Sequence, residues 1–122
     1  MLYEKITERI ISSAIAVHRV VGPGLAESSY QAAMAIEMTD QGLRFEREPT
    51  LAVTYKGATI GQHRPDFIVE ECVVVELKAV HALEAVFTAQ VLTYLRVARL
   101  EVGLLINFNV DALKLGIKRI VK

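Results

Sequence analysis

The segment Val73-Val74-Val75-Glu76-Leu77-Lys78-Ala79 decides the fold, because it is apolar, rich in β-branched residues and bounded by polar residues. These properties are typical of a buried β-strand. Side chains alternate between the two faces of a strand, so Glu76 and Lys78 project from one face and Leu77 from the other. A buried acid and a buried lysine are costly unless each has a partner or a use.

A second acid lies shortly upstream, in Arg64-Pro65-Asp66, where another short apolar strand is expected to begin. A divalent metal ion held by Asp66 and Glu76, with Lys78 beside a water molecule, would account for all three side chains. The sequence therefore predicts a chemical site on two neighbouring strands.

The composition indicates one domain, spanning residues 1–122. Of the 122 residues, 52% are hydrophobic and 23% are charged, which is an ordinary balance for a globular protein of this size. No apolar run approaches the roughly 20 residues needed to cross a bilayer, so no membrane association is expected. The single Cys72 excludes an internal disulfide and a cysteine-based zinc site, and it is typical of the reducing cytoplasm.

Helical and extended patterns alternate along the chain in the order ααβββ-αββ, which predicts an α/β sandwich with a mixed sheet. Helices are expected at about Ile6–Val21, Glu27–Gln41 and Leu83–Arg99. Strands are expected within Leu43–Tyr55 (interrupted near Pro49), around Ile60 after a turn at Lys56-Gly57, at Asp66–Val69, Val73–Ala79, Val102–Phe108 and Ile117–Val121.

The third predicted helix has an amide within its apolar stripe. Gln90 shares this stripe with Phe87 and Val91, and Tyr94 follows Gln90 by one turn. A buried amide needs a hydrogen-bond partner. A structural role and a functional role are both open for Gln90 at this point.

Together these residues resemble a known family. Asp66, Glu76-x-Lys78 and Gln90-x-x-x-Tyr94 are similar to the signature of the PD-(D/E)XK nuclease superfamily in its RecB-like variety. Within it, the chain resembles the small bacterial GxxExxY proteins, and their motif stands here as Gly24-Leu25-Ala26-Glu27-Ser28-Ser29-Tyr30. The likeness runs from about Ile6 to Val121 and includes Val17-His18-Arg19, Gly22-Pro23-Gly24, Glu76–Val80, Ala89–Leu95 and Gly103–Asn109.

This resemblance implies a restriction-endonuclease-like three-layer core, with helices flanking a mixed sheet. It implies a Mg²⁺- or Mn²⁺-dependent nuclease that hydrolyses phosphodiester bonds, in DNA rather than RNA. Carboxylate, carbonyl and water oxygens suit these ions better than zinc. By the same resemblance, Asp66, Glu76 and Glu27 are metal ligands, Lys78 attends the attacking water, and Gln90 and Tyr94 support the site or contact nucleic acid.

Each of these positions also has a structural interpretation. The helix dipole alone favours Glu27 in a first turn, Asp66 could cap a turn, and Glu76 with Lys78 could form an ion pair. The alternative function is therefore a catalytically silent, nuclease-like binding or assembly module. The intact set of acids and lysine favours the enzyme, because a retired site has no physical reason to keep so costly an arrangement.

Charge and surface composition complete the prediction. A formal net charge of zero argues against a protein that coats DNA non-specifically. It does not argue against a nuclease, because acids that bind metal cancel the charge of basic residues elsewhere. The basic stretch Lys114–Lys122 forms either a phosphate-facing edge or, the more frequent case, a solvated face. The apolar segments Val102–Phe108 and Ile117–Val121 predict pairing of two copies into a homodimer.

Overall fold

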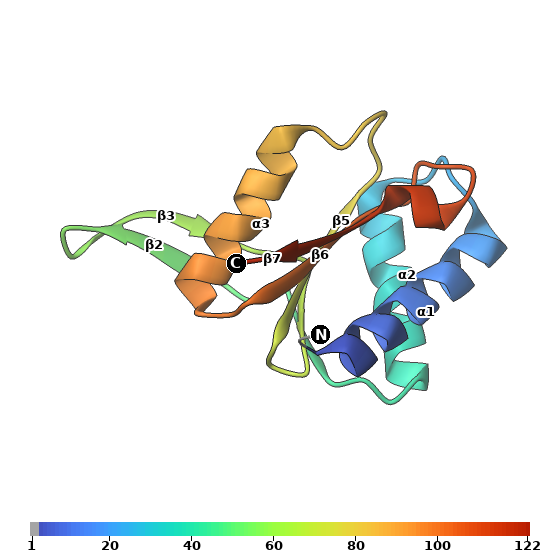
Figure 1. Cartoon of the computed structure of the whole chain (residues 1–122), viewed down its shortest axis with the longest axis horizontal. Coiled ribbons are helices and arrows are strands. Elements are labelled where there is room, and N and C mark those ends of the chain that lie inside the picture. Colours follow the sequence, from blue (N-terminus) through green and yellow to red (C-terminus); the bar gives the residue numbers. More distant parts are fainter. Residues whose placement is uncertain (1–2) are drawn as a thin grey trace.

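A five-stranded mixed β-sheet forms the centre of the protein, with helices on both of its faces (Figure 1). The computed structural model describes residues 3–122. In chain order the elements are α1 (Glu4–Val21), α2 (Glu27–Asp40), β1 (Phe45–Arg47), β2 (Leu51–Tyr55), β3 (Ala58–His63), β4 (Phe67–Val69), β5 (Val73–Lys78), α3 (Ala85–Ala98), β6 (Val102–Asn107), the 3₁₀ turn η1 (Leu113–Gly116) and β7 (Ile117–Val121).

The strands of the main sheet lie in the order β1-β4-β5-β6-β7. Strands β5 and β6 are parallel, and every other neighbouring pair in this sheet is antiparallel. The parallel pair is connected through α3, because parallel strands need a long crossover connection. The predicted mixed sheet flanked by helices is thus confirmed.

The alternation of side chains along β5 divides the core into two layers. Its odd-numbered residues pack with α1 and α2, whereas Val74 packs with the buried face of α3. By the same alternation, Glu76 and Lys78 lie on the face that α3 covers. Glu76 and Lys78 are therefore placed between the sheet and α3.

The strand pattern between α2 and α3 differs from the expected one. Five strands occupy this region, whereas four segments were expected there and the predicted order ααβββ-αββ counted three of them. The segment expected as one interrupted strand forms β1 and β2, which belong to different sheets. The backbone of Glu48 has a positive φ of 52°, and Pro49 follows with no N–H to donate. These two residues redirect the chain, so that β1 pairs with β4 while β2 pairs only with β3.

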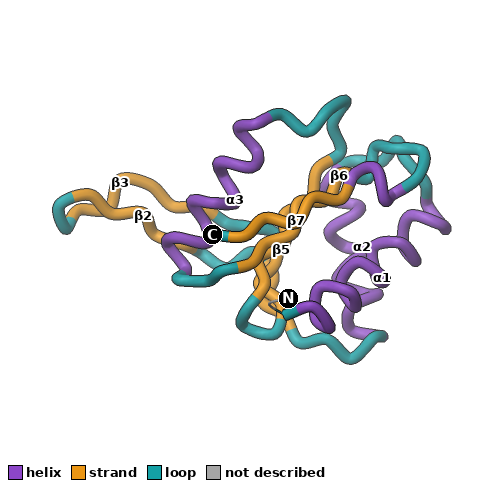
Figure 2. Tube along the Cα trace, viewed as in Figure 1, coloured by secondary structure: helices purple, strands orange, loops and turns teal. Residues whose placement is uncertain are grey.

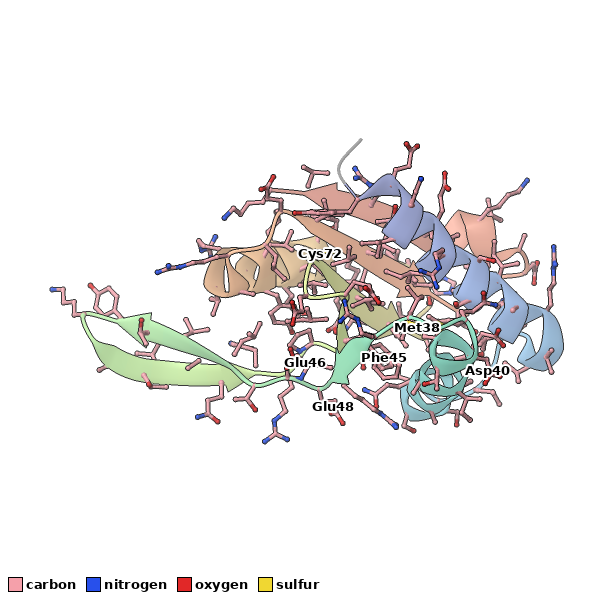
Figure 3. All side chains as sticks on the ribbon, turned by 90° about the horizontal axis from the view of Figure 1, so that it is seen from below. Met38, Asp40, Phe45, Glu46, Glu48 and Cys72 are labelled. Atoms are coloured by element: carbon pink, nitrogen blue, oxygen red, sulfur yellow. The ribbon has the colours of Figure 1, made fainter. Side chains whose placement is uncertain are left out.

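Strands β2 and β3 form a two-stranded hairpin that projects away from the body of the molecule (Figure 2). We call residues 51–63 the ribbon. Its tip is the predicted turn: Lys56 and Gly57 have φ values of 48° and 82°, as the two central residues of a type I′ turn require. Figure 3 shows Phe45, Glu46 and Glu48 where the chain leaves the body for the ribbon.

Helix α3 buries Val91, Tyr94 and Leu95 and exposes Gln90. The prediction that Gln90 lies on the buried stripe is therefore wrong. The apolar face of α3 is centred on Val91, where the absence of a side chain on Gly103 of β6 lets the helix approach the sheet closely. Gln90 precedes Val91 by about 100° around the helix and so points out of this contact.

Two further findings bear on membranes and assembly. No helix within residues 3–122 is long and apolar enough to cross a lipid bilayer.

Strand β6 is internal and buried along its whole length, so it offers no surface to a second copy. The homodimer prediction therefore depends on the edge strand β7, where Val121 is exposed.

Candidate functional site

Two carboxyl groups meet where β4 and β5 pair. Phe67 lies opposite Val75, so the preceding Asp66 comes next to Glu76 on the adjacent strand. The backbone N–H of Asp66 donates to Glu76 Oε1 at 3.1 Å, and the Leu77 N–H donates to Asp66 Oδ2 at 2.7 Å. The antiparallel register of one hairpin thus holds both acids in contact.

The carboxyl of Glu76 is buried, with 7% of the residue exposed. Burial raises the pKa of Glu76 to about 8, and the nearby charge of Asp66 and a hydrogen bond between the two side chains raise it as well. Glu76 therefore holds a proton at pH 7 when no cation is bound. Two adjacent carboxylates, of which Glu76 is buried and Asp66 half-buried, cannot both ionise cheaply without a compensating positive charge.

Lys78 places its amine beside this pair. Its Nζ lies 3.9 Å from Glu76 Oε2 and 4.6 Å from the centre of the Phe87 ring on α3. A cation over an aromatic face is attracted to the ring, so Phe87 helps to hold the amine near the acids. The side chain of Lys78 keeps 15% of its surface exposed.

Two further residues order Asp66, and sequence reasoning missed both. Gln31 of α2 donates from Nε2 to Asp66 Oδ1 at 2.7 Å, and Arg47 of β1 donates from Nε to Gln31 Oε1 at 2.8 Å. Gln31 follows Glu27 by four residues and so shares its helical face, which is a signal that could have found it. Arg47 has no comparable signal, because its position depends on the pairing of β1 with β4.

Tyr94 and Gln90, expected as supporting residues, differ in their surroundings. Tyr94 is buried, and burial, together with the charges of Glu76 and Asp66, raises the pKa of its hydroxyl to about 12. The hydroxyl is therefore a neutral donor near the acids. Gln90 is exposed, and its side chain makes no hydrogen bond within residues 3–122.

The segment from Gly24 to Tyr30 includes the start of α2, which a hydrogen bond links to the backbone just after β5. Glu27 is exposed, and its Oε2 accepts a hydrogen bond from the Ala79 N–H at 3.2 Å, one residue beyond Lys78. The Tyr30 hydroxyl donates to the Gly22 carbonyl at 2.6 Å. Glu27 thus approaches the same end of the sheet as Asp66 and Glu76 but is engaged with the backbone.

Tyr30, Asn107 and His18 have structural partners. The Tyr30 ring stacks on Phe108 at 4.4 Å between centroids. Asn107 donates to the Val80 carbonyl at 2.9 Å and accepts from the Val80 N–H at 3.1 Å, which fixes the loop after β5. The buried His18 places Nε2 at 3.2 Å and 2.8 Å from the carbonyl oxygens of residues 108 and 110.

The donor set can be compared with what a divalent cation requires. Across residues 3–122, no three Asp, Glu, His or Cys side chains are arranged to hold a metal ion together, so the expected set of Asp66, Glu76 and Glu27 is not gathered. Asp66 and Glu76 by themselves fit Mg²⁺ or Mn²⁺, which prefer carboxylate oxygens and keep several waters. A cation would also relieve the charge crowding that now keeps a proton on Glu76.

Comparison with known proteins identifies the family. A family model described as the PD-(D/E)XK nuclease superfamily matches residues 4–120. No curated protein and no solved structure matches the chain significantly. The matched range includes both layers of helices, the main sheet except the last residue of β7, and each site residue described above. The chain therefore belongs to the PD-(D/E)XK nuclease superfamily.

Proposed function

We propose that the protein is a Mg²⁺- or Mn²⁺-dependent nuclease that hydrolyses phosphodiester bonds in DNA. The contact between the Asp66 and Glu76 carboxyl groups, with the Lys78 amine 3.9 Å from Glu76, supports this function best. A purely structural ion pair would need one acid, whereas here the half-buried Asp66 adds a second carboxyl group beside the buried Glu76. Membership of a nuclease superfamily agrees with the proposal.

The chain's own residues would divide the work. Asp66 and Glu76 would hold the ion, which when bound polarises the phosphodiester, supplies hydroxide and stabilises the leaving oxygen. Asp66 is ready to do so because the Leu77 N–H and Gln31 fix its two oxygens. Glu76 would release its proton as the cation arrives, since the two compete for the same negative charge.

Lys78 and Tyr94 would act on the substrate side. The Lys78 amine, held against Phe87, would orient the attacking water and screen the charge that develops on the phosphate. The Tyr94 hydroxyl keeps its proton at neutral pH, so it would serve as a hydrogen-bond donor. Gln90 is exposed on the same helix and would contact the nucleic acid rather than the ion.

We also propose that the protein belongs to the GxxExxY group, and the three residues of that motif have distinct roles in this chain. The backbone of Gly24 has a φ of 102°, a value that residues with a side chain rarely adopt. Glu27 orders the backbone beyond Lys78 through the Ala79 N–H, and Tyr30 closes the loop between α1 and α2. The motif thus supports the end of β5 on which the site depends.

Cleavage assays with matched variants test the function. The purified protein is expected to cleave DNA with Mg²⁺ or Mn²⁺ and to stop when EDTA is added. Lys78→Met keeps an aliphatic chain against Phe87 but lacks the charge, so it is expected to lower cleavage by about 100-fold or more while Mn²⁺ binding, measured by calorimetry, persists. Asp66→Asn is expected to lose both Mn²⁺ binding and cleavage.

Lys5→Met on α1 is the control, since Lys5 is exposed and outside the site. Cleavage that survives Lys78→Met unchanged would indicate a contaminating nuclease. A wild-type protein that binds no Mn²⁺ and cleaves no DNA or RNA would instead favour the catalytically silent binding module.

A further inference from the structure

Among the strands of residues 3–122, the two of the ribbon are the ones that lie outside the main sheet. None of residues 50–64 is buried, and the strands expose Tyr55 and Ile60 with 62% and 66% of their surfaces accessible. Only one side of the ribbon rests on the body, where Leu51 packs against the α3 cluster. Figures 1 and 3 show the rest extending beyond the other elements. Two strands alone add little stability in water, so the core gives no reason for the projection.

The ribbon differs from the rest of the chain in its charge. Lys56 is the one Lys, Arg, Asp or Glu of the ribbon, Arg64 directly follows the ribbon, and the nearest acids in the chain are Glu48 before it and Asp66 after it. Residues 85–100, which include α3, contain Arg96 and Arg99 and no acid. By contrast, α2 contains three acids and no basic residue. The net charge of zero therefore conceals a basic sector formed by the ribbon and α3.

This basic sector begins at the site. Strand β3 ends at His63, three residues before Asp66, and the His63 ring lies 6.0 Å from the Tyr94 ring. The six residues of β3 extend about 20 Å at roughly 3.3 Å per residue. A polyanion bound along the ribbon would therefore lead directly to the carboxylates.

Building on the proposed nuclease function, we infer that the ribbon enters the major groove of a B-form DNA duplex next to the bond to be cleaved. Two strands about 5 Å apart, with their side chains, fit a groove about 12 Å wide. The basic residues Lys56 and Arg64 would contact phosphates, and the exposed Thr54, Thr59 and Gln62 carry donors and acceptors for base edges. An A-form RNA duplex has a deep, narrow major groove that excludes such a ribbon.

The turn allows a test that leaves the fold intact. Lys56→Asn removes the charge and creates an Asn-Gly pair, which favours the same type I′ turn. Binding is measured in EDTA by fluorescence anisotropy with a labelled 20-base-pair DNA duplex, an RNA duplex of the same sequence and the single strands. Lys5→Gln on α1 is the control for an equal loss of charge.

The wild type is expected to prefer the DNA duplex. Lys56→Asn is expected to weaken its binding about threefold to tenfold and to reduce the slope of log affinity against log salt by about 1, whereas Lys5→Gln leaves both unchanged. With Mg²⁺, Lys56→Asn should raise KM at an unchanged kcat.

The ribbon inference and the nuclease function can fail separately. Equal affinity of Lys56→Asn and the wild type for the duplex, in a protein that cleaves DNA, overturns the ribbon inference and leaves the nuclease. Weakened duplex binding by Lys56→Asn without cleavage by the wild type supports the ribbon and removes the nuclease. Equal binding of RNA duplex or single strands overturns the duplex assignment. If light scattering shows that Lys56→Asn differs from the wild type in oligomeric state while its affinity for DNA is unchanged, the ribbon contacts a second copy of the protein and the inference is overturned.

Discussion

At the scale of single residues, Asp66 is the most firmly oriented member of the site. Each of its carboxylate oxygens accepts one hydrogen bond at 2.7 Å, from Gln31 on one side and the Leu77 N–H on the other. Gln31 is itself fixed by Arg47. A chain of contacts therefore runs from β1 through α2 to a carboxylate on the neighbouring strand.

Removing the Gln31 amide is expected to loosen Asp66 without removing a charge. Gln31→Leu should lower Mn²⁺ affinity about tenfold, which is typical for loss of a hydrogen bond behind a metal ligand, and Arg47→Met should have a smaller effect in the same direction. Calorimetric titration with Mn²⁺ measures both. Gln41→Leu, at the exposed end of α2, is the matched control and should bind Mn²⁺ as the wild type does. Unchanged affinity in Gln31→Leu would mean that Leu77 alone orients Asp66.

At the scale of elements, the sequence predicted most of what alternation and periodicity control. The helices begin and end close to their expected residues, and Glu76 and Lys78 share a face because side chains alternate along β5. The pattern does not specify which strands pair, so it could not separate β1 from β2 or bring Arg47 to Gln31. Gln90 was misplaced because helical spacing indicates a stripe but not the point on it that meets the sheet.

The turn from η1 into β7 also acts on the site, through Gly116. A Cβ at this position would collide with the carbonyl oxygen of Asn107, whose side chain holds the loop that follows Lys78. Gly116→Ala is therefore expected to lower the free energy of unfolding by about 1–3 kcal/mol, measured by urea denaturation. Gly61→Ala is the control, because its Cβ would make an ordinary 3.6 Å contact with His63 Nε2. Equal stability of the two variants would show that the backbone at Asn107 yields easily.

At the scale of the whole molecule, the buried carboxyl group of Glu76 links the stability of the metal-free fold to pH. The pKa of Glu76 rises from about 4.5 to about 8 on folding, so between these values the folded state binds more protons than the unfolded state. The free energy of unfolding should therefore fall as pH rises from about 4.5 to about 8, by at most about 1.4 kcal/mol per pH unit for one proton. Above pH 8 this group adds no further change.

Thermal or urea denaturation in EDTA between pH 5 and 8.5 measures this effect. Glu76→Gln cannot ionise and should have a flatter stability profile than the wild type over the same range. Mn²⁺ should stabilise the wild type more at pH 8 than at pH 6. At pH 8 a larger fraction of Glu76 is already ionised, so Mn²⁺ binding less often has to displace a proton from it. Parallel profiles for wild type and Glu76→Gln would contradict a raised pKa at this residue.

The placement of both acids on one hairpin also affects the order of folding. Asp66 and Glu76 are ten residues apart, joined by a turn in which Glu70 and Glu71 have positive φ, so closing this contact restricts only a short loop. The contact of Gln31 with Asp66 spans 35 residues, and the parallel pairing of β5 with β6 has to wait for α3. The acids therefore come together first in water, where like charges repel weakly. Their repulsion grows as the helices close over the sheet, so we expect Glu76 to take up its proton, or the pair to bind its cation, in a late step of folding.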